Sequence, residues 1–245
     1  GDGKIIETRS TEALTIEGEE THIASFAFNR EGASFDAEYT DGASDNGNGS
    51  SVREKDVNKD IKYINPFKDV KETDWFYESV KFVVENKLMI GTSSDKFEPE
   101  MPVTRGMLVT VLHRLENEPV SVKSSFSDIS EGEYYSDAVA WAQQSGIING
   151  MSETMFGPDE KITREQFAAI LYRYALYKEY GAGTGAELSS YQDAHMISDY
   201  ALTAMQWAVG EGIIKGRSNA NLWPSGNTTR AEMAEMLYRF IMLYK

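Results

Sequence analysis

Three Thr-Arg pairs stand at equivalent places in the chain and are its clearest candidates for chemistry. They are Thr104-Arg105, Thr163-Arg164 and Thr229-Arg230. The second and third pairs have Gln or Glu three residues after the Thr, which predicts a capping box at the start of a helix. The capping box does not explain the arginine, because a cation at this end opposes the helix dipole. An anion would explain it, bound by the guanidinium in a bidentate manner with help from the helix amides.

An internal ion pair is the alternative explanation for each arginine. Ahead of each Thr-Arg pair, an Asp follows an aromatic residue by two positions, at Asp69, Asp128 and Asp193. These carboxylates are candidates both for the ligand site and for a salt bridge to the arginine of a neighbouring segment. The spacing alone leaves the two interpretations open.

Aromatic residues and glycines also recur between the Asp and the Thr-Arg pair. The aromatic candidates are Trp75, Tyr134 and Tyr200. If exposed, such rings can serve as stacking platforms for a sugar; core packing is the alternative, which we favour for Phe82, Trp141 and Trp207. The glycines Gly91, Gly150 and Gly216 are interpreted first as helix C-caps, and second as points where a ligand approaches the backbone.

All of these motifs belong to three tandem repeats, Phe67–Leu115, Phe126–Tyr174 and Tyr191–Phe240. In each repeat a proline stands eight residues after the glycine, and the Thr-Arg pair begins thirteen residues after the same glycine. Each repeat closes with the sequence Leu-x-Arg, followed by one more large apolar residue. Apolar residues at i, i+3 and i+4 predict two helices per repeat, the second beginning at the Thr. Two short helices cannot bury their apolar faces alone. The predicted fold is therefore mainly α: three helix-loop-helix units packed as a pseudo-threefold bundle, with grooves between neighbours.

The first 65 residues differ from the repeats. Parts of residues 1–40 alternate apolar and polar side chains and predict a small β-rich N-terminal segment. It is interpreted as the tail of a preceding module or as a hairpin that packs on the residues that follow. Residues 41–65 are interpreted as a linker. Their Asp and Asn residues suit calcium, but the ligand spacing and the closing Glu of a calcium loop are missing. The repeat boundaries are placed at 66–120, 121–180 and 186–245.

Composition excludes several classes of function. The 245 residues include no cysteine, which removes disulfides, thiolate metal sites and cysteine nucleophiles. A net charge of −15 argues against nucleic acid as a partner, and no apolar run is long enough for a membrane span. The three histidines lie far from any candidate nucleophile, so we expect no catalysis, no cofactor and no metal. The first residues do not form a signal peptide, which indicates a cytosolic protein or a processed piece.

The order of motifs resembles three S-layer homology (SLH) repeats over about residues 66–245. The second repeat carries the resemblance most fully, with Phe126-Ser127-Asp128-Ile129, Gly146-Ile147-Ile148-Asn149-Gly150, Phe156-Gly157-Pro158-Asp159 and Ile162-Thr163-Arg164-Glu165. The resemblance implies a secreted, non-catalytic module at the cell surface of a Gram-positive-type bacterium. Its ligand would be a secondary cell wall polysaccharide linked to peptidoglycan, often pyruvylated, and other surface-layer subunits would be possible partners. The pyruvate carboxylate would bind Arg105, Arg164 and Arg230 in the grooves.

Two repeats depart from the family pattern. The first Thr-Arg pair is followed by Gly106-Met107, and the third repeat has Leu222-Trp223 before its proline and one extra residue after Asp193. We therefore expect the clearest site around Arg164, then Arg230, then Arg105. The alternative function is an α-helical protein-interaction or S-layer assembly module that uses the same grooves.

Overall fold

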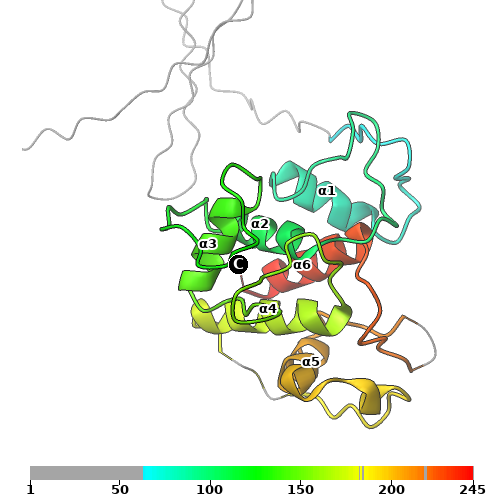
Figure 1. The fold of residues 1–245 in the computed structure, drawn as a ribbon. Coiled ribbons are helices and arrows are strands. Elements are labelled where there is room, and N and C mark those ends of the chain that lie inside the picture. The colour runs from blue at the N-terminus through cyan, green and yellow to red at the C-terminus, as the bar shows by residue number, and fades with distance from the viewer. Residues whose placement is uncertain (1–62, 182, 184, 218–219, 245) are drawn as a thin grey trace, which may run out of the picture. The chain divides into compact units, whose positions relative to one another are not determined.

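The computed structural model describes residues 63–181, 183, 185–217 and 220–244 (Figure 1). Within these residues the α-helices are α1 (Tyr77–Glu85), α2 (Arg105–Leu115), α3 (Ser136–Gln144), α4 (Arg164–Tyr177), α5 (Leu202–Gly210) and α6 (Arg230–Tyr244). Two short 3-10 helices, η1 (Ala194–Met196) and η2 (Asp199–Ala201), precede α5. The described part contains isolated β-bridges but no strand, which confirms the mainly α class. The β-rich segment predicted for residues 1–40, and the linker as far as residue 62, lie outside the described residues.

The second helix of every repeat begins at its Thr-Arg pair, as predicted. At α4, Thr163 Oγ1 accepts from Gln166 N–H (3.3 Å) and Gln166 Oε1 accepts from Thr163 N–H (3.2 Å), which forms a complete capping box. Thr229 and Glu232 make the same two bonds at α6. At α2 only the bond from Met107 N–H to Thr104 Oγ1 is present, because Met107 has no side-chain oxygen to return it.

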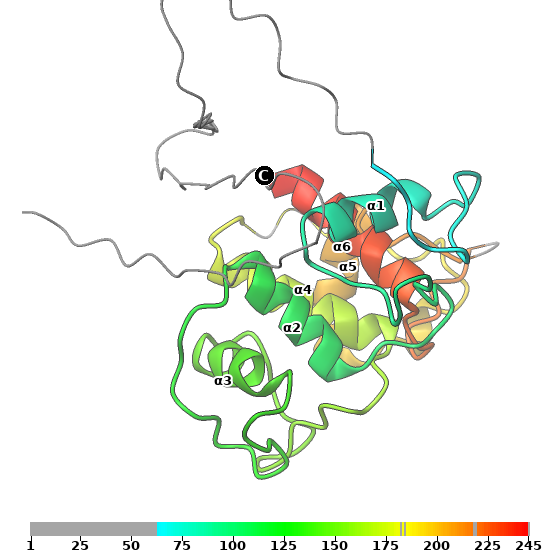
Figure 2. The ribbon, with the colours of Figure 1, turned by 90° about the horizontal axis from the view of Figure 1, so that it is seen from above.

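The helices pair between repeats. α3 packs on α2, α5 on α4, and α1 on α6. The first helix of each repeat thus covers the second helix of the preceding repeat, and the third repeat is joined back to the first. Figures 1 and 2 show α2, α4 and α6 in the middle, with α1, α3 and α5 around them. This closed arrangement confirms the pseudo-threefold bundle.

Three backbone hydrogen bonds close the bundle at its centre. Val103 N–H donates to Thr228 O (2.9 Å), Thr228 N–H to Ile162 O (3.0 Å), and Ile162 N–H to Val103 O (3.0 Å). All three residues are fully buried. Each directly precedes a Thr-Arg pair, so the starts of α2, α4 and α6 meet around one point.

The apolar positions assigned to the helices form the core. Leu108, Leu171 and Leu237 are fully buried in α2, α4 and α6, while Leu115 is only partly buried. The later aromatics also pack inside: Trp141 and Trp207 are buried, and Phe82 is partly buried against the core, which confirms the interpretation for those rings.

The glycines Gly91, Gly150 and Gly216 are not helix C-caps, which corrects that prediction. α1, α3 and α5 are capped at Asn86, Ser145 and Glu211, five residues before each glycine. The left-handed residue after each helix is instead Lys87, Gly146 or Gly212. A Cβ at Gly91 would lie 2.5 Å from both the Phe67 ring and Ser93 O. Glycine is needed there because the chain passes against the aromatic residue that opens the repeat.

Candidate functional site

The three Thr-Arg arginines hold neighbouring repeats together. Arg105, in the first repeat, donates from Nε to Phe156 O (2.9 Å) and from Nη2 to Asn149 O (2.9 Å), both in the second repeat. The other two arginines make the equivalent bonds, from Arg164 to Leu222 O and Lys215 O, and from Arg230 to Phe97 O and Ile90 O. All three are buried. Each arginine thus fastens its repeat to the loop of the next one.

The repeated Asp residues bind the other side of the same loops. Asp128 accepts from Phe156 N–H (2.9 Å) and Gly157 N–H (2.7 Å). Asp69 and Asp193 accept from the equivalent amides of their own repeats. Among the described residues, these carboxylates form no ion pair with the Thr-Arg arginines, and they do not line the grooves defined below.

The helix starts are closed to an anion. Arg105 N–H and Gly106 N–H donate to Glu160 O (3.0 Å) and Pro158 O (2.8 Å), and the first two amides of α4 and α6 bind carbonyls in the same way. The expectation that these amides assist an anion is therefore wrong, because their hydrogens are already bound. An anion can reach the guanidinium groups only from the grooves.

A groove lies at each junction between repeats. Groove A, about 230 Å³, is lined by Leu88, Met89, Ile90, Gly91, Met107, Thr110, Val111, Arg114, Tyr134, Arg230 and Met233. Groove B, about 320 Å³, is lined by Arg105, Asn149, Gly150, Met151, Gln166, Ala169, Ile170, Arg173 and Tyr200. Groove C, about 420 Å³, is lined by Trp75, Arg164, Lys215, Gly216, Arg217, Glu232, Glu235, Met236 and Arg239. Each groove combines a glycine, a second-helix arginine, a Thr-Arg arginine and one aromatic ring from three different repeats.

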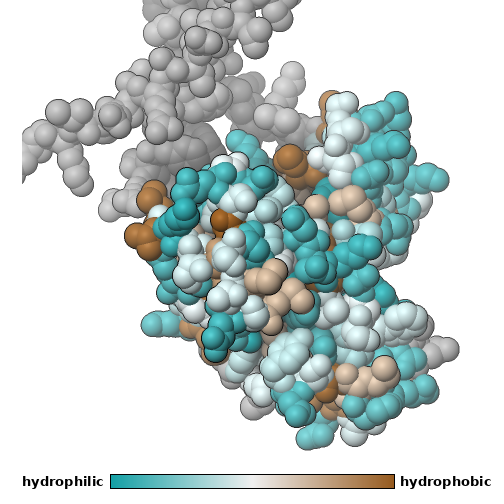
Figure 3. Space-filling view, in the orientation of Figure 1, coloured by the Kyte–Doolittle hydropathy of each residue, from teal (hydrophilic) through white to brown (hydrophobic). Residues whose placement is uncertain are grey.

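Every groove is positively charged in an acidic chain. Grooves A and B each have two arginines and no carboxylate among their lining residues. Groove C has four cations and two carboxylates, and so the same net charge of +2. The whole chain, by contrast, carries −15. Figure 3 shows one face of the molecule, where hydrophilic side chains dominate and hydrophobic ones form small separate patches.

The arginines of groove B have no carboxylate partner among the described residues. Nη1 of Arg105 makes no hydrogen bond with the described residues. Arg173 Nη2 donates only to the side-chain oxygen of Asn149 (3.3 Å), with the Asn149 amide in the orientation that satisfies its hydrogen bonds. Burial lowers the pKa of both arginines from the ordinary value. Burial thus disfavours their charged form, and an anion in the groove would offset that cost.

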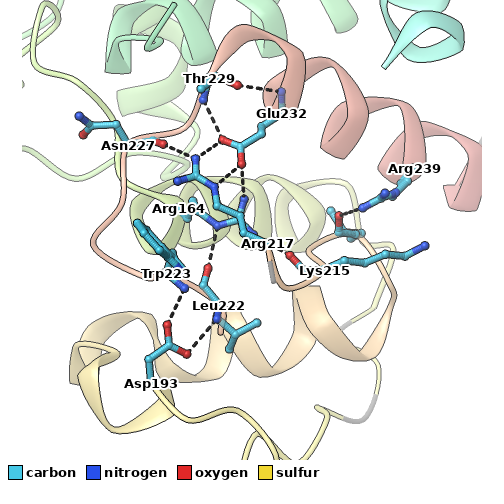
Figure 4. Close-up of polar contacts among 11 residues, drawn as sticks. Arg164, Asp193, Lys215, Arg217, Leu222, Trp223, Asn227, Thr229, Glu232 and Arg239 are labelled. Atoms are coloured by element: carbon cyan, nitrogen blue, oxygen red, sulfur yellow. Dashed lines mark hydrogen bonds and ion pairs between the residues drawn. The ribbon is translucent and has the colours of Figure 1, made fainter. Parts of the chain in front are cut away.

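Three of the four cations of groove C, the arginines, already have carboxylate partners (Figure 4). Glu232 binds Arg164 (3.2 Å) and Arg217, and Glu235 binds Arg239 (2.7 Å). Burial alone would raise the pKa of Glu232. The hydrogen bonds from Arg217 and Thr229 N–H, with the charge of Arg164, outweigh burial and hold that pKa below its usual range. Glu232 therefore partly neutralises the arginines of groove C from within the protein.

The three candidate rings are exposed at the grooves, as a stacking platform requires. Trp75 is 62% exposed, and Tyr134 and Tyr200 are each 55% exposed. They line grooves C, A and B respectively.

Sequence reasoning missed the second-helix arginines, Arg114, Arg173 and Arg239. Each lines a groove beside a Thr-Arg arginine. The available signal was their recurrence in the Leu-x-Arg sequence that closes every repeat.

The described residues lack two features that would point to other functions. None of their helices combines the length and apolar character needed to cross a bilayer. They also contain no group of three His, Cys, Asp or Glu residues placed to hold a metal ion.

A closed ring of three helical repeats, with a cation-lined groove at each junction, defines the class of this module. The family model of the S-layer homology domain matches residues 66–106, 125–168 and 190–234. The chain belongs to this family, which confirms the resemblance in its sequence.

Curated proteins of several kinds are similar to this chain. An endoglucanase of Bacillus sp. (strain KSM-635) is 33% identical over 173 residues, 70% of this chain and 18% of that protein. A surface-layer 125 kDa protein of Lysinibacillus sphaericus is 28% identical, over 67% of this chain and 14% of that protein. A cellulosome-anchoring protein of Acetivibrio thermocellus is 26% identical, over 58% of this chain and 33% of that protein. The chain therefore spans a third or less of the length of these relatives.

Proposed function

We propose that this chain is a non-catalytic module that anchors a secreted protein to the cell wall of a Gram-positive-type bacterium. Its ligand would be an acidic secondary cell wall polysaccharide linked to peptidoglycan, bound in the inter-repeat grooves. The observation that carries the proposal is the +2 charge of every groove, beside an exposed ring, in a chain of net charge −15. A guanidinium pair next to a ring suits a sugar that bears a carboxylate, such as a pyruvate ketal.

The relatives support anchoring rather than catalysis. Their names describe an enzyme, a surface-layer protein and an anchoring protein, yet each shares this module over a minor part of its length. A module common to proteins with such different activities is expected to determine where each protein is held, not which reaction it catalyses. The catalysis in the endoglucanase would then belong to its other residues.

Groove B is proposed as the main anion site, followed by groove A. Arg105 and Arg173 face groove B without carboxylates, whereas Arg164 in groove C is already paired with Glu232. This order is the reverse of the one suggested by the completeness of the Thr-Arg motifs. The two orders differ because Glu232, which completes the capping box of the third repeat, is the residue that pairs with Arg164 of the second repeat.

The local charge matters more than the net charge for such a ligand. At physiological ionic strength, charges further apart than about 8 Å are largely screened, so an acidic chain can bind an acidic polymer at short range. If several grooves engage one polymer, linked binding adds roughly 10²–10⁴ over the affinity of a single groove.

A wall pull-down with matched charge variants tests the proposal. Arg173→Gln removes one cation from groove B, and Lys68→Gln removes one from an exposed pair with Asp95 outside the grooves. The wild type should bind native walls and not walls stripped of polymer with hydrofluoric acid. Arg173→Gln should weaken binding by about tenfold or more, the loss expected for a charge-assisted hydrogen bond, and Lys68→Gln should not.

Circular dichroism would establish that both variants are folded. Equal binding to stripped walls would contradict the polymer as ligand. Binding to other surface-layer subunits instead would favour the protein-interaction alternative.

A further inference from the structure

Glu165 makes contacts between the second and third repeats, beside groove B, that have no counterpart at the other two junctions of the described repeats. It lies in the first turn of α4, in the second repeat, and is buried. Its Oε2 accepts from Ser198 N–H (2.9 Å), and its Oε1 accepts from Ser198 Oγ (2.9 Å) and, at a longer 3.4 Å, from the Tyr200 O–H. All of these donors belong to the third repeat. A single carboxylate therefore holds the short segment that presents the groove B ring.

The equivalent residues at the other junctions differ in a coordinated way. At the junction of the first and second repeats, the equivalents of Glu165, Ser198 and Ala201 are Gly106, Gly132 and Tyr135. At the junction of the third and first repeats they are Ala231, Thr73 and Phe76. A Cβ at Gly106 would lie 3.2 Å from the Tyr135 ring, so that ring fills the space beside α2. The third repeat has the small Ala201 at this place, and the Glu165 side chain is present instead.

The other two groove rings are supported by an adjacent ring. Trp75 meets Phe76 edge-on at 5.2 Å between ring centroids, and Tyr134 meets Tyr135 at 5.0 Å. Tyr200 is followed by Ala201 and has no such neighbour in the chain. Its support must therefore come from elsewhere, and Glu165 with Ser198 supplies it.

Helix capping does not account for the placement of Glu165. A carboxylate in the first turn of a helix is favourable while it is exposed to solvent, but burying one is costly unless its oxygens are bonded. Glu165 is buried, and its oxygens bind η2 and the residue before it rather than its own helix. It also forms no ion pair with Arg105 or Arg173 among the described residues, so the guanidinium groups of groove B keep no carboxylate partner.

We propose that Glu165 is a positioning residue: through Ser198 and the Tyr200 hydroxyl it holds the Tyr200 ring at the rim of groove B for stacking on a sugar. This inference rests on the proposed function, because it concerns the ligand of the same groove. Groove B would then combine the arginines that lack carboxylate partners with a ring fixed in place.

The test compares the affinity of solubilised wall polymer for the wild type and for Glu165→Ala, each with and without Tyr200→Ala. We expect Glu165→Ala to weaken binding by about three- to tenfold, the range of one or two net hydrogen bonds. With Tyr200→Ala present, Glu165→Ala should have no further effect, because the ring that it positions is gone. Glu78→Ala, an exposed carboxylate in the first turn of α1, is the matched control and should leave affinity unchanged.

Titration of Tyr200 gives a second readout that does not depend on ligand. Burial, and then the Glu165 carboxylate, raise the pKa of Tyr200 to about 12. The difference in ultraviolet absorbance between the wild type and Tyr200→Phe should show this ionisation, and Glu165→Ala should lower its midpoint towards 10. Ser198→Ala, which removes only one hydroxyl, repeats both measurements if Glu165→Ala fails to fold.

The outcomes separate the two proposals. The positioning role would be overturned if Glu165→Ala weakened binding equally with and without Tyr200→Ala, or weakened it in neither case. The anchoring function would stand in both cases. A wild type that does not bind the polymer would overturn the anchoring function. The Tyr200 midpoint would then still decide the structural half of the inference, because an unchanged midpoint would show that Glu165 does not hold the ring.

Discussion

At the residue scale, Asp128 illustrates how a repeated polar side chain can serve the backbone. Its two oxygens bind the amides of Phe156 and Gly157. Asp128→Ala would leave both amides without that partner, at about 1–3 kcal/mol each where water cannot replace the bond. We expect the free energy of unfolding in urea to fall by about 2–4 kcal/mol, with wall affinity of the folded protein unchanged. Asp159→Ala, exposed on the same loop, is the control; a stable Asp128→Ala that no longer binds polymer would place Asp128 in the ligand site.

Glu232 predicts a pH dependence of stability. Its pKa in the folded chain lies below its ordinary value of 4.5, so near that pH the unfolded chain binds more protons and stability rises with pH. The contribution is complete above about pH 4.5 and is lost as the pH falls through the folded pKa. The difference in unfolding free energy between the wild type and Glu232→Gln should be largest at pH 7 and shrink below pH 4.5. A constant difference, or the same trend in the exposed Glu153→Gln, would contradict this.

The groove arginines show how far sequence alone reaches at this scale. Recurrence identified Arg105 as one of three equivalent residues, but its partners, the carbonyls of Phe156 and Asn149, lie in the next repeat. No spacing within one repeat could reveal them. Arg173 was missed because a long cationic side chain in an amphipathic helix usually lies on the solvated face.

At the element scale, the segment Gly146–Gly150 between α3 and its following loop contains two glycines with different roles. Gly146 has a left-handed φ of +68° and open space around its Cα, whereas a Cβ at Gly150 would collide with two backbone oxygens and the Phe126 ring. Gly146→Ala should cost about 1 kcal/mol of backbone strain, and Gly150→Ala about 3 kcal/mol from forced displacement. Urea denaturation would compare them, and equal costs would mean that the loop accommodates a side chain easily.

These two glycines also show which features of the helices the sequence pattern could not predict. Periodicity predicted the helices and the Thr caps correctly, because both depend on residues three and four positions apart. The cap was assigned to Gly150 rather than Gly146, since both follow the helix closely and only the backbone φ separates them. The pairing of α3 with α2 was likewise outside the pattern, which gives a helix its apolar face but not the helix that covers it.

At the scale of the whole molecule, the closed ring makes every junction depend on the other two. α1 of the first repeat packs on α6 of the third, and Arg230 fastens that junction through Phe97 O and Ile90 O. An open array of repeats can unfold one unit at a time. In a closed ring, opening one junction uncovers a helix face on each side, so we expect the three repeats to unfold together.

The chain carries its own probes for this last prediction, because Trp141 lies in the second repeat and Trp207 in the third, both buried. Two variants, each keeping only one of these tryptophans, would be unfolded in urea with and without Arg230→Lys. A lysine lacks the planar fork through which Arg230 reaches the two carbonyls from Nε and Nη2. The variant should therefore lose about 2 kcal/mol, the value of a hydrogen bond to a charged group. Both tryptophans should report the same shifted midpoint, although the junction that Arg230 holds joins the third repeat to the first and does not include the second. If the Trp207 midpoint moved while the Trp141 midpoint stayed, the repeats would behave as separate units and the ring would not be a cooperative structure.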